Sequence, residues 1–131
     1  MKKIVGLIAL TAILSACGSE VNWKSVDADG QTDSYIANVE YDKEGSSVTF
    51  DLLTDFKGSA QTVNAKAGSA IANITLNCQT QMAVTHRIDF YSEHMGQGRI
   101  TNSRVGSAKQ AQKLDLSDPS NTNAKRLCDR L

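Results

Sequence analysis

The chain has 131 residues and carries 14 basic and 14 acidic side chains, so its formal net charge at pH 7 is zero. This length suits one small domain with a modest core. A neutral chain lacks the strong positive field with which proteins attract nucleic acid, and we expect no nucleic-acid partner.

The first 16 residues have the pattern of a secretory signal peptide. Met1-Lys2-Lys3 is a short basic region, and residues 4–14 follow it without a charge. This apolar run is shorter than the roughly 20 residues that a membrane-spanning helix needs. We therefore expect residues 1–16 to be removed, and residues 22–131 to form the folded domain.

A cysteine stands directly after this leader. Leu14-Ser15-Ala16-Cys17 resembles the lipobox of bacterial lipoproteins, in which the cysteine sulfur receives a diacylglycerol and the cysteine becomes an acylated N-terminus. Two or three acyl chains anchor a protein stably, so we expect Cys17 to hold the protein to a membrane. Residues 17–21 form a tether, and the reach from Cys17 to the domain is about 20 Å even when extended. Gly18, which follows Cys17, favours sorting of the protein to the outer membrane. The sequence is compatible with a domain on either face of that membrane.

Alternating side chains predict strands in the first half of the domain. Short strands are expected at Asn22–Val26 and Ser34–Val39, separated by turn-forming residues. A longer strand is expected over Ser47–Phe56, with Val48, Phe50, Leu52 and Phe56 on one face and Thr49, Asp51 and Asp55 on the other. Residues 57–69 are small and polar, as in a loop.

The next two segments read as a hairpin. Ala70–Cys78 places Cys78 on its apolar face with Ala72, Ile74 and Leu76. Met82–Ser92 follows a short turn, and its alternation predicts one apolar face made of Met82, Val84, His86, Ile88 and Phe90. Residues 93–98 break the alternation, with Gly96 and Gly98 at positions suited to positive φ. Residues 99–105 are expected to return as a last strand.

The C-terminus changes to a helical period. Asp118-Pro119 offers an N-cap followed by proline at the first helical position. Ala124, Leu127, Cys128 and Leu131 then fall on one face of a short helix.

Cys78 and Cys128 are the two cysteines that remain after Cys17, and both belong to an exported domain. In an oxidising compartment two cysteines normally form a disulfide, whereas metal sites need more Cys or His at close spacing. Since both lie on apolar faces, we expect a bridge that clips the final helix onto the sheet. It would stabilise the domain by roughly 4 kcal/mol on the chain-entropy estimate.

Several of these segments together resemble the surface-adhesin protein E family of Gram-negative lipoproteins. The resemblance rests on Ile74–Cys78, Thr85–Glu93 and Met95–Gly98, followed by a last cysteine in a terminal helix. It implies a mainly β (α+β) fold: one curved antiparallel sheet of about five or six strands with a C-terminal helix held by the Cys78–Cys128 disulfide. It also implies binding of host extracellular proteins such as vitronectin and laminin and, for the type member, haem binding and self-association as a homodimer.

The candidate binding surface contains six residues: Arg87, Asp89, Tyr91, His94, Gly96 and Gly98. The first three alternate outward on one strand, and the others lie in the glycine-bearing turn that follows it; plain cross-strand pairing is the structural alternative. His94, Tyr91 and Met95 have haem-ligand chemistry, but we expect no cofactor besides the lipid on Cys17, and no metal. His86 is expected to be a hydrogen-bonded core or sheet-edge histidine.

No catalytic arrangement can be placed, because neither histidine has a nucleophile signature beside it. The first hypothesis is therefore a lipid-anchored, non-enzymatic envelope protein that acts as a protein-binding module, with adhesion to host matrix proteins as its function. The second is a periplasm-facing structural or inhibitory lipoprotein with no host contact, whose partner would be another envelope protein. Residues 68–85 contain neither a charged nor an aromatic side chain, which favours the second hypothesis.

Overall fold

A computed structural model describes residues 21–28, 32–57 and 67–130. The predicted signal peptide, the predicted lipidation site Cys17, nearly all of the expected tether and most of the 57–69 loop lie outside the described residues. The described part contains every strand and the final helix that the sequence predicts.

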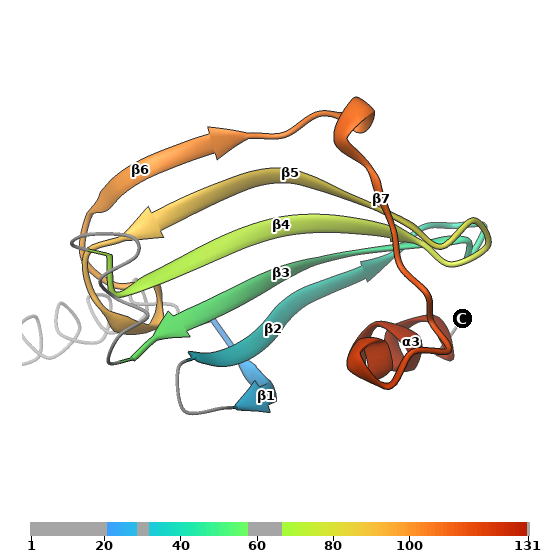
Figure 1. The fold of residues 1–131 in the computed structure, drawn as a ribbon, viewed down its shortest axis with the longest axis horizontal. Coiled ribbons are helices and arrows are strands. Elements are labelled where there is room, and N and C mark those ends of the chain that lie inside the picture. Colours follow the sequence, from blue (N-terminus) through green and yellow to red (C-terminus); the bar gives the residue numbers. More distant parts are fainter. Residues whose placement is uncertain (1–20, 29–31, 58–66, 131) are drawn as a thin grey trace, which may run out of the picture.

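Six strands follow one another in an antiparallel meander (Figure 1). They are β1 (Lys24–Ala28), β2 (Thr32–Tyr41), β3 (Ser47–Phe56), β4 (Ser69–Asn77), β5 (Met82–Tyr91) and β6 (Ile100–Val105). A short seventh strand, β7 (Gln112–Lys113), pairs with the start of β5. The predicted curved antiparallel sheet with a C-terminal helix is confirmed, with β7 as an addition.

The ends of the first two strands differ from the prediction. β1 begins two residues later than expected, and β2 extends beyond the predicted Ser34–Val39 at both ends. A bulge explains why the period fails in β2: the pairing with β3 shifts between Ala37 and Glu40, and Asn38 has a φ of 54°. An inserted residue reverses the alternation, so a period-two pattern ends there although the strand continues.

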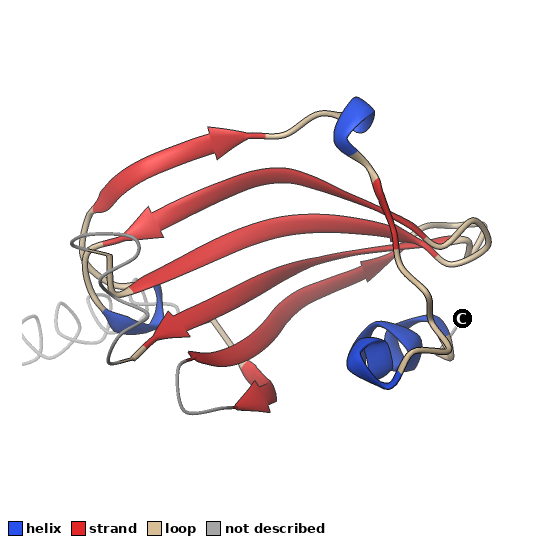
Figure 2. Cartoon of the chain, viewed as in Figure 1, coloured by secondary structure: helices blue, strands red, loops and turns tan. Residues whose placement is uncertain are grey.

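The C-terminal helix packs across one face of the sheet, near the end where β7 pairs with β5 (Figure 2). The 3₁₀ turn η3 (Pro119–Asn121) leads directly into α3 (Thr122–Cys128). Asp118 accepts a hydrogen bond from the Ser120 amide at 2.9 Å, which confirms the predicted cap, but the capped turn is η3 rather than α3. Leu131 lies outside the described residues.

The predicted disulfide joins α3 to the end of β4. Cys78 and Cys128 are bonded with their Cα atoms 5.6 Å apart, across a sequence separation of 50 residues. The Tyr41 hydroxyl also donates a hydrogen bond to the Leu127 carbonyl oxygen at 2.9 Å. The short helix is therefore held by a covalent bond and by a polar contact from β2, which it needs because a helix of this length is marginal alone.

We call the sheet face that packs against α3 the helix face. Its core joins Val48, Phe50 and Leu76 of the sheet to Leu127 of α3, and Val48 and Leu76 are completely buried. A second cluster on the same face lies toward the far end of the sheet, formed by Phe56, Ala67 and Ala70 with Ile88 and Phe90 against them. The predicted shared face of Val48, Phe50, Leu52 and Phe56 is confirmed.

The opposite face, which we call the loop face, was predicted to be polar along β3 but is partly buried. Leu53 is completely buried on it, and Asp55 beside it is 9% exposed. The cover is η1 (His94–Gly96), a 3₁₀ turn that contacts β3, β4 and β5. β3 is thus buried on both faces at this end, which a half-buried strand pattern does not predict.

The prediction for β5 is wrong over its first half. The pairing of β4 with β5 shifts between Asn73 and Ile74, so that Asn73 faces Arg87 and Ile74 faces Thr85, and His86 is the extra residue. Ala83 packs in the helix-face core, while His86 is exposed and its Nε2 lies 2.8 Å from the Thr75 hydroxyl. His86 is therefore hydrogen-bonded, as expected, but on the loop face rather than in the core.

Candidate functional site

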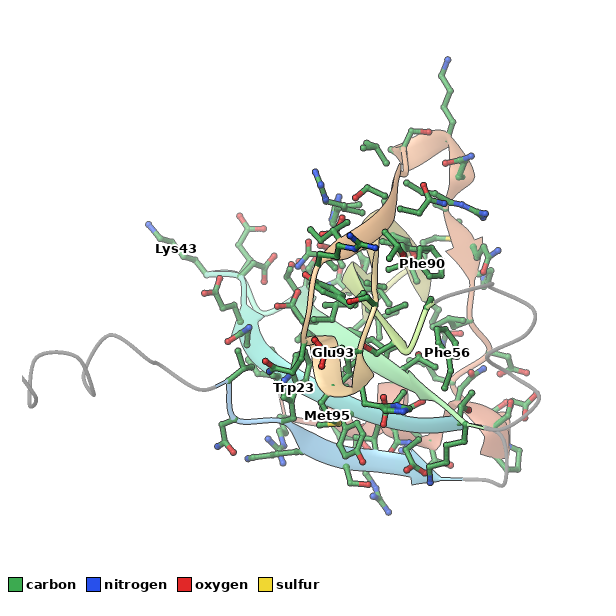
Figure 3. All side chains as sticks on the ribbon, turned by 90° about the vertical axis from the view of Figure 1, so that its left-hand side faces the viewer. Trp23, Lys43, Phe56, Phe90, Glu93 and Met95 are labelled. Carbon is green, nitrogen blue, oxygen red and sulfur yellow. A yellow bond between two sulfur atoms is a disulfide. The ribbon has the colours of Figure 1, made fainter. Side chains whose placement is uncertain are left out.

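The 93–98 loop lies against the loop face and is held there by Asp55 of β3. The Asp55 carboxylate oxygen Oδ1 lies 3.0 Å from Nδ1 of His94 and accepts a hydrogen bond from the Met95 amide at 3.1 Å. The His94 side chain remains 58% exposed, whereas that of Asp55 is 12% exposed. A nearly buried carboxylate thus fixes an exposed imidazole. Figure 3 views this end of the sheet, with Glu93 and Met95 labelled on the loop.

Ser69, at the start of β4, fixes the same loop from a second point. Its hydroxyl donates to the Glu93 carbonyl oxygen at 2.7 Å and accepts from the Gly96 amide at 2.8 Å. Ser69 is completely buried, so its hydroxyl is shielded from water in both of these part-buried hydrogen bonds. Two buried side chains on neighbouring strands therefore determine the conformation of the loop.

The two glycines of the loop are required by its backbone, as predicted. Gly96 and Gly98 have φ values of 69° and 79°, in the left-handed region that favours glycine. A Cβ at Gly96 would also lie 2.8 Å from Cδ1 of Ile71, because the loop backbone rests directly on the sheet. Met95 adopts the same left-handed region with a φ of 57°. Gly96 and Gly98 therefore allow the backbone conformation of the loop, and neither has a side chain that could contact a partner.

Arg87 and Asp89 form an ion pair on the loop face of β5. Arg87 Nε lies 2.8 Å from Asp89 Oδ1, and the Ser103 hydroxyl of β6 donates to the same oxygen at 2.6 Å. Arg87 is 53% exposed and Asp89 is 19% exposed in their side chains. Arg87 is therefore exposed, as expected, while the structural alternative, cross-strand pairing, is present in the contact of Ser103 with Asp89.

The pKa values of Asp89 and Tyr91 on this face are both shifted from their usual values, in opposite directions. Burial acts to raise the pKa of Asp89, but the hydrogen bonds from Ser103 and Arg87 and the charge of Arg87 outweigh it and lower that pKa. Burial, with the nearby charge of Asp89, raises the pKa of Tyr91. At neutral pH the face presents an ionised Asp89, a paired Arg87 and an un-ionised Tyr91.

The structure places all six predicted residues on or beside the loop face, in two groups. Arg87, Asp89 and Tyr91 belong to β5, and His94, Gly96 and Gly98 belong to the loop that follows. Asp55, Ser69 and Ser103, which hold these groups in place, were not among the predicted residues. Asp55 was placed correctly on the polar side of its strand, but its contact with His94 spans 39 residues and leaves no local signal in the sequence.

The described residues offer no metal centre: no three of their His, Cys, Asp or Glu side chains are grouped as ligands would be. Residues 21–28, 32–57 and 67–130 likewise contain no helix that is long and apolar enough to span a membrane.

An antiparallel sheet, a disulfide-clipped helix on one face and a loop fixed on the opposite face together define a small β domain. The chain belongs to the surface-adhesin protein E family, whose family model matches residues 23–129. This confirms the resemblance seen in the sequence. A comparison with curated protein sequences gives no match.

Solved structures of Haemophilus influenzae protein E have the same fold. One is 18% identical with a TM-score of 0.55, and the alignment covers 83% of this chain and 95% of that one. Crystal form II is 21% identical with a TM-score of 0.54, covering 86% and 98%. Protein E from a non-typeable strain is 20% identical with a TM-score of 0.51, covering 84% and 86%. At these identities the likeness establishes the fold alone.

Proposed function

We propose that this protein is a lipid-anchored, non-enzymatic adhesin of the outer membrane, which binds host extracellular matrix proteins through its loop face. Membership of the surface-adhesin protein E family supports a function in adhesion. The lipobox-like Leu14–Cys17 supports a lipid anchor on Cys17, since one diacylglycerol and a further acyl chain hold a protein stably at a membrane.

The observation that carries this proposal is the contrast in exposure across the loop face. His94 and Arg87 are more than half exposed, while their partners Asp55 and Asp89 are largely covered. Side chains fixed in this way lose little conformational entropy when a partner protein binds them, so they suit a preorganised contact surface. Arg and Tyr, both present here as Arg87 and Tyr91, are also enriched at the energetically important positions of interfaces.

The second candidate is a structural or inhibitory lipoprotein that faces the periplasm. The absence of charged and aromatic residues from 68–85 favours it, because this stretch, which supplies β4, the turn after it and the start of β5, carries no basic side chain for a host protein. The short tether after Cys17 also keeps the domain within about 20 Å of the lipid.

Protease treatment of intact cells separates the two candidates. An adhesin on the outer surface is degraded while a known periplasmic protein in the same cells stays intact. Survival of the mature band until the outer membrane is permeabilised would exclude adhesion in those cells and would support the periplasmic candidate. Loss of the band makes immobilised vitronectin and laminin the next binding partners to test.

A further inference from the structure

The helix face is only partly covered by α3. The helix has seven residues and seals Val48 and Leu76, which have no exposure. Farther along the face four large aliphatic side chains stay half-buried: Ile36, Leu52, Ile74 and Ile88. They line a groove of about 670 Å³ that is bounded by α3 on one side and by Gln110 of η2 (Ala108–Gln110) and Gln112 of β7 on the other. Ligand sites commonly have about 300–1,000 Å³.

The groove has one charged side chain, and it is a cation. Of the residues that line it only Arg104 is charged; the others are apolar or uncharged polar residues. Arg104 is exposed, and its guanidinium carbon lies 5.7 Å from the centre of the Phe90 ring, which is labelled in Figure 3. Within the described part of the chain Arg104 makes no ion pair. Its charge is therefore available to a ligand.

We propose that this groove binds a single-chain amphiphile with an anionic headgroup. The acyl chain would lie on Ile36, Leu52, Ile74 and Ile88 and remove their remaining apolar surface from water. The headgroup would pair with Arg104, whose planar guanidinium can bind a carboxylate or a phosphate through two parallel hydrogen bonds. The uncharged amides of Gln110 and Gln112 add donors at the groove wall without opposing a negative charge.

This inference is independent of the proposed adhesion. The groove lies on the helix face, whereas the candidate binding surface lies on the loop face of the same sheet. A ligand in the groove would leave Arg87 and His94 exposed, and loss of ligand binding would leave adhesion unchanged.

Calorimetric titration tests the proposal on residues 18–131, the expected mature chain without its lipidated Cys17, exported behind a cleavable secretory signal so that the disulfide forms. This chain contains all described strands and helices, which lie between Lys24 and Cys128. The probes are palmitate and lysophosphatidylglycerol below their micelle-forming concentrations, with monopalmitoylglycerol as a neutral probe of equal chain length. Comparing the two anionic probes distinguishes a free fatty acid from a lysophospholipid.

Saturable binding of at least one anionic probe is expected. Arg104→Gln should weaken it by about tenfold or more, because a charge-assisted contact is lost, and should leave the neutral probe unaffected. Laurate, which is four methylenes shorter than palmitate, should bind at least about tenfold more weakly if the chain is buried. The control is Arg99→Gln, which removes an exposed cation that does not line the groove.

Three results would overturn the proposal. They are the absence of saturable binding of both anionic probes, equal affinity of wild type and Arg104→Gln, and an equal loss of affinity in Arg99→Gln. Arg104 is exposed on β6, so its replacement leaves the core intact, and an unchanged melting temperature verifies that the variant is folded.

Discussion

His94 and Asp55 lie 39 residues apart in the sequence and 3.0 Å apart in space, and their contact fixes the 93–98 loop on the sheet. The same Asp55 oxygen accepts the Met95 amide. The loop is thus part of the folded sheet domain, and the exposed His94 ring is held at a defined place on its surface.

Replacing Asp55 with alanine should release this loop. The substitution removes the acceptor of two hydrogen bonds and leaves the Met95 amide without its partner, at a cost of about 1–3 kcal/mol. Hydrogen exchange of the Met95 amide should become at least about tenfold faster. Asp51→Ala is the matched control, since Asp51 accepts hydrogen bonds from Asn38 and Asn73 but not from the loop. Equal exchange rates in wild type and Asp55→Ala would contradict the account.

Replacing Gly96 with alanine should destabilise the loop for two reasons. The left-handed backbone costs about 1 kcal/mol or more for a residue with a side chain, and the new Cβ would press on Cδ1 of Ile71. Gly45→Ala separates these terms, because Gly45 has the same φ of 69° in the turn between β2 and β3, away from Ile71. Chemical denaturation should show a larger loss for Gly96→Ala; equal losses would mean that the contact with Ile71 has no energetic effect.

Replacing Cys128 with serine should lower the melting temperature by more than about 10 °C, because the loop that the bridge closes is worth roughly 4 kcal/mol. The Cys78–Cys128 bond encloses the whole β5–β7 region and α3. Cys78→Ser should lower the melting temperature equally, and the double variant should lose no more than either alone. A melting temperature that is unchanged in Cys128→Ser would show that the bridge does not stabilise the domain.

The Arg87–Asp89 pair should contribute to stability in a pH-dependent way. The pKa of Asp89 is lowered in the folded state, so its contribution is present above the unfolded value of about 3.9 and is lost as the pH falls through the folded pKa. Because Arg87 is 53% exposed, we expect less than about 1 kcal/mol. The difference in unfolding free energy between wild type and Asp89→Asn should shrink as the pH falls from about 5 to 2.

Ser103→Ala provides the control for this effect, since it removes one of the hydrogen bonds that lower the pKa of Asp89 and keeps the charge. Measured in the Ser103→Ala background, the difference in unfolding free energy that Asp89→Asn causes should depend on pH less strongly than in the wild-type background, but the dependence should not disappear. A difference between wild type and Asp89→Asn that is constant over this pH range would contradict the assigned cause.

The sequence predicts those parts of the fold that depend on local period. β3, β4 and β5 follow from alternation, and the disulfide follows from Cys78 and Cys128 on two apolar faces in an exported chain. Bulges defeat the same reasoning, because one inserted residue at His86 moves Met82 and Val84 to the face opposite Ile88. Tertiary contacts are not encoded in the local sequence pattern either. No residue near Leu53 or Met95 in the sequence indicates that the 93–98 loop covers Leu53.

The sequence predicted the six residues of the candidate binding surface, but not the residues that hold them in place. Arg87, Asp89 and Tyr91 share a face because of the strand period alone, and Gly96 and Gly98 follow from turn chemistry. Asp55 and Ser69 act through contacts between residues 24 to 40 positions apart, which no periodicity encodes. Arg104 likewise becomes a candidate ligand-binding residue only because the fold places it beside the groove.

The central claim, that the loop face binds host matrix proteins, is tested most directly by measuring binding of the purified mature chain to immobilised vitronectin and laminin. Wild type should bind at least one of them saturably. Arg87→Glu should reduce the affinity by about tenfold or more, as for an interface arginine of high energetic weight. Lys109→Glu, which makes the same charge change in η2 outside the loop face, should bind like wild type. Absence of binding by wild type to both proteins, or equal affinity of wild type and Arg87→Glu, would contradict the claim.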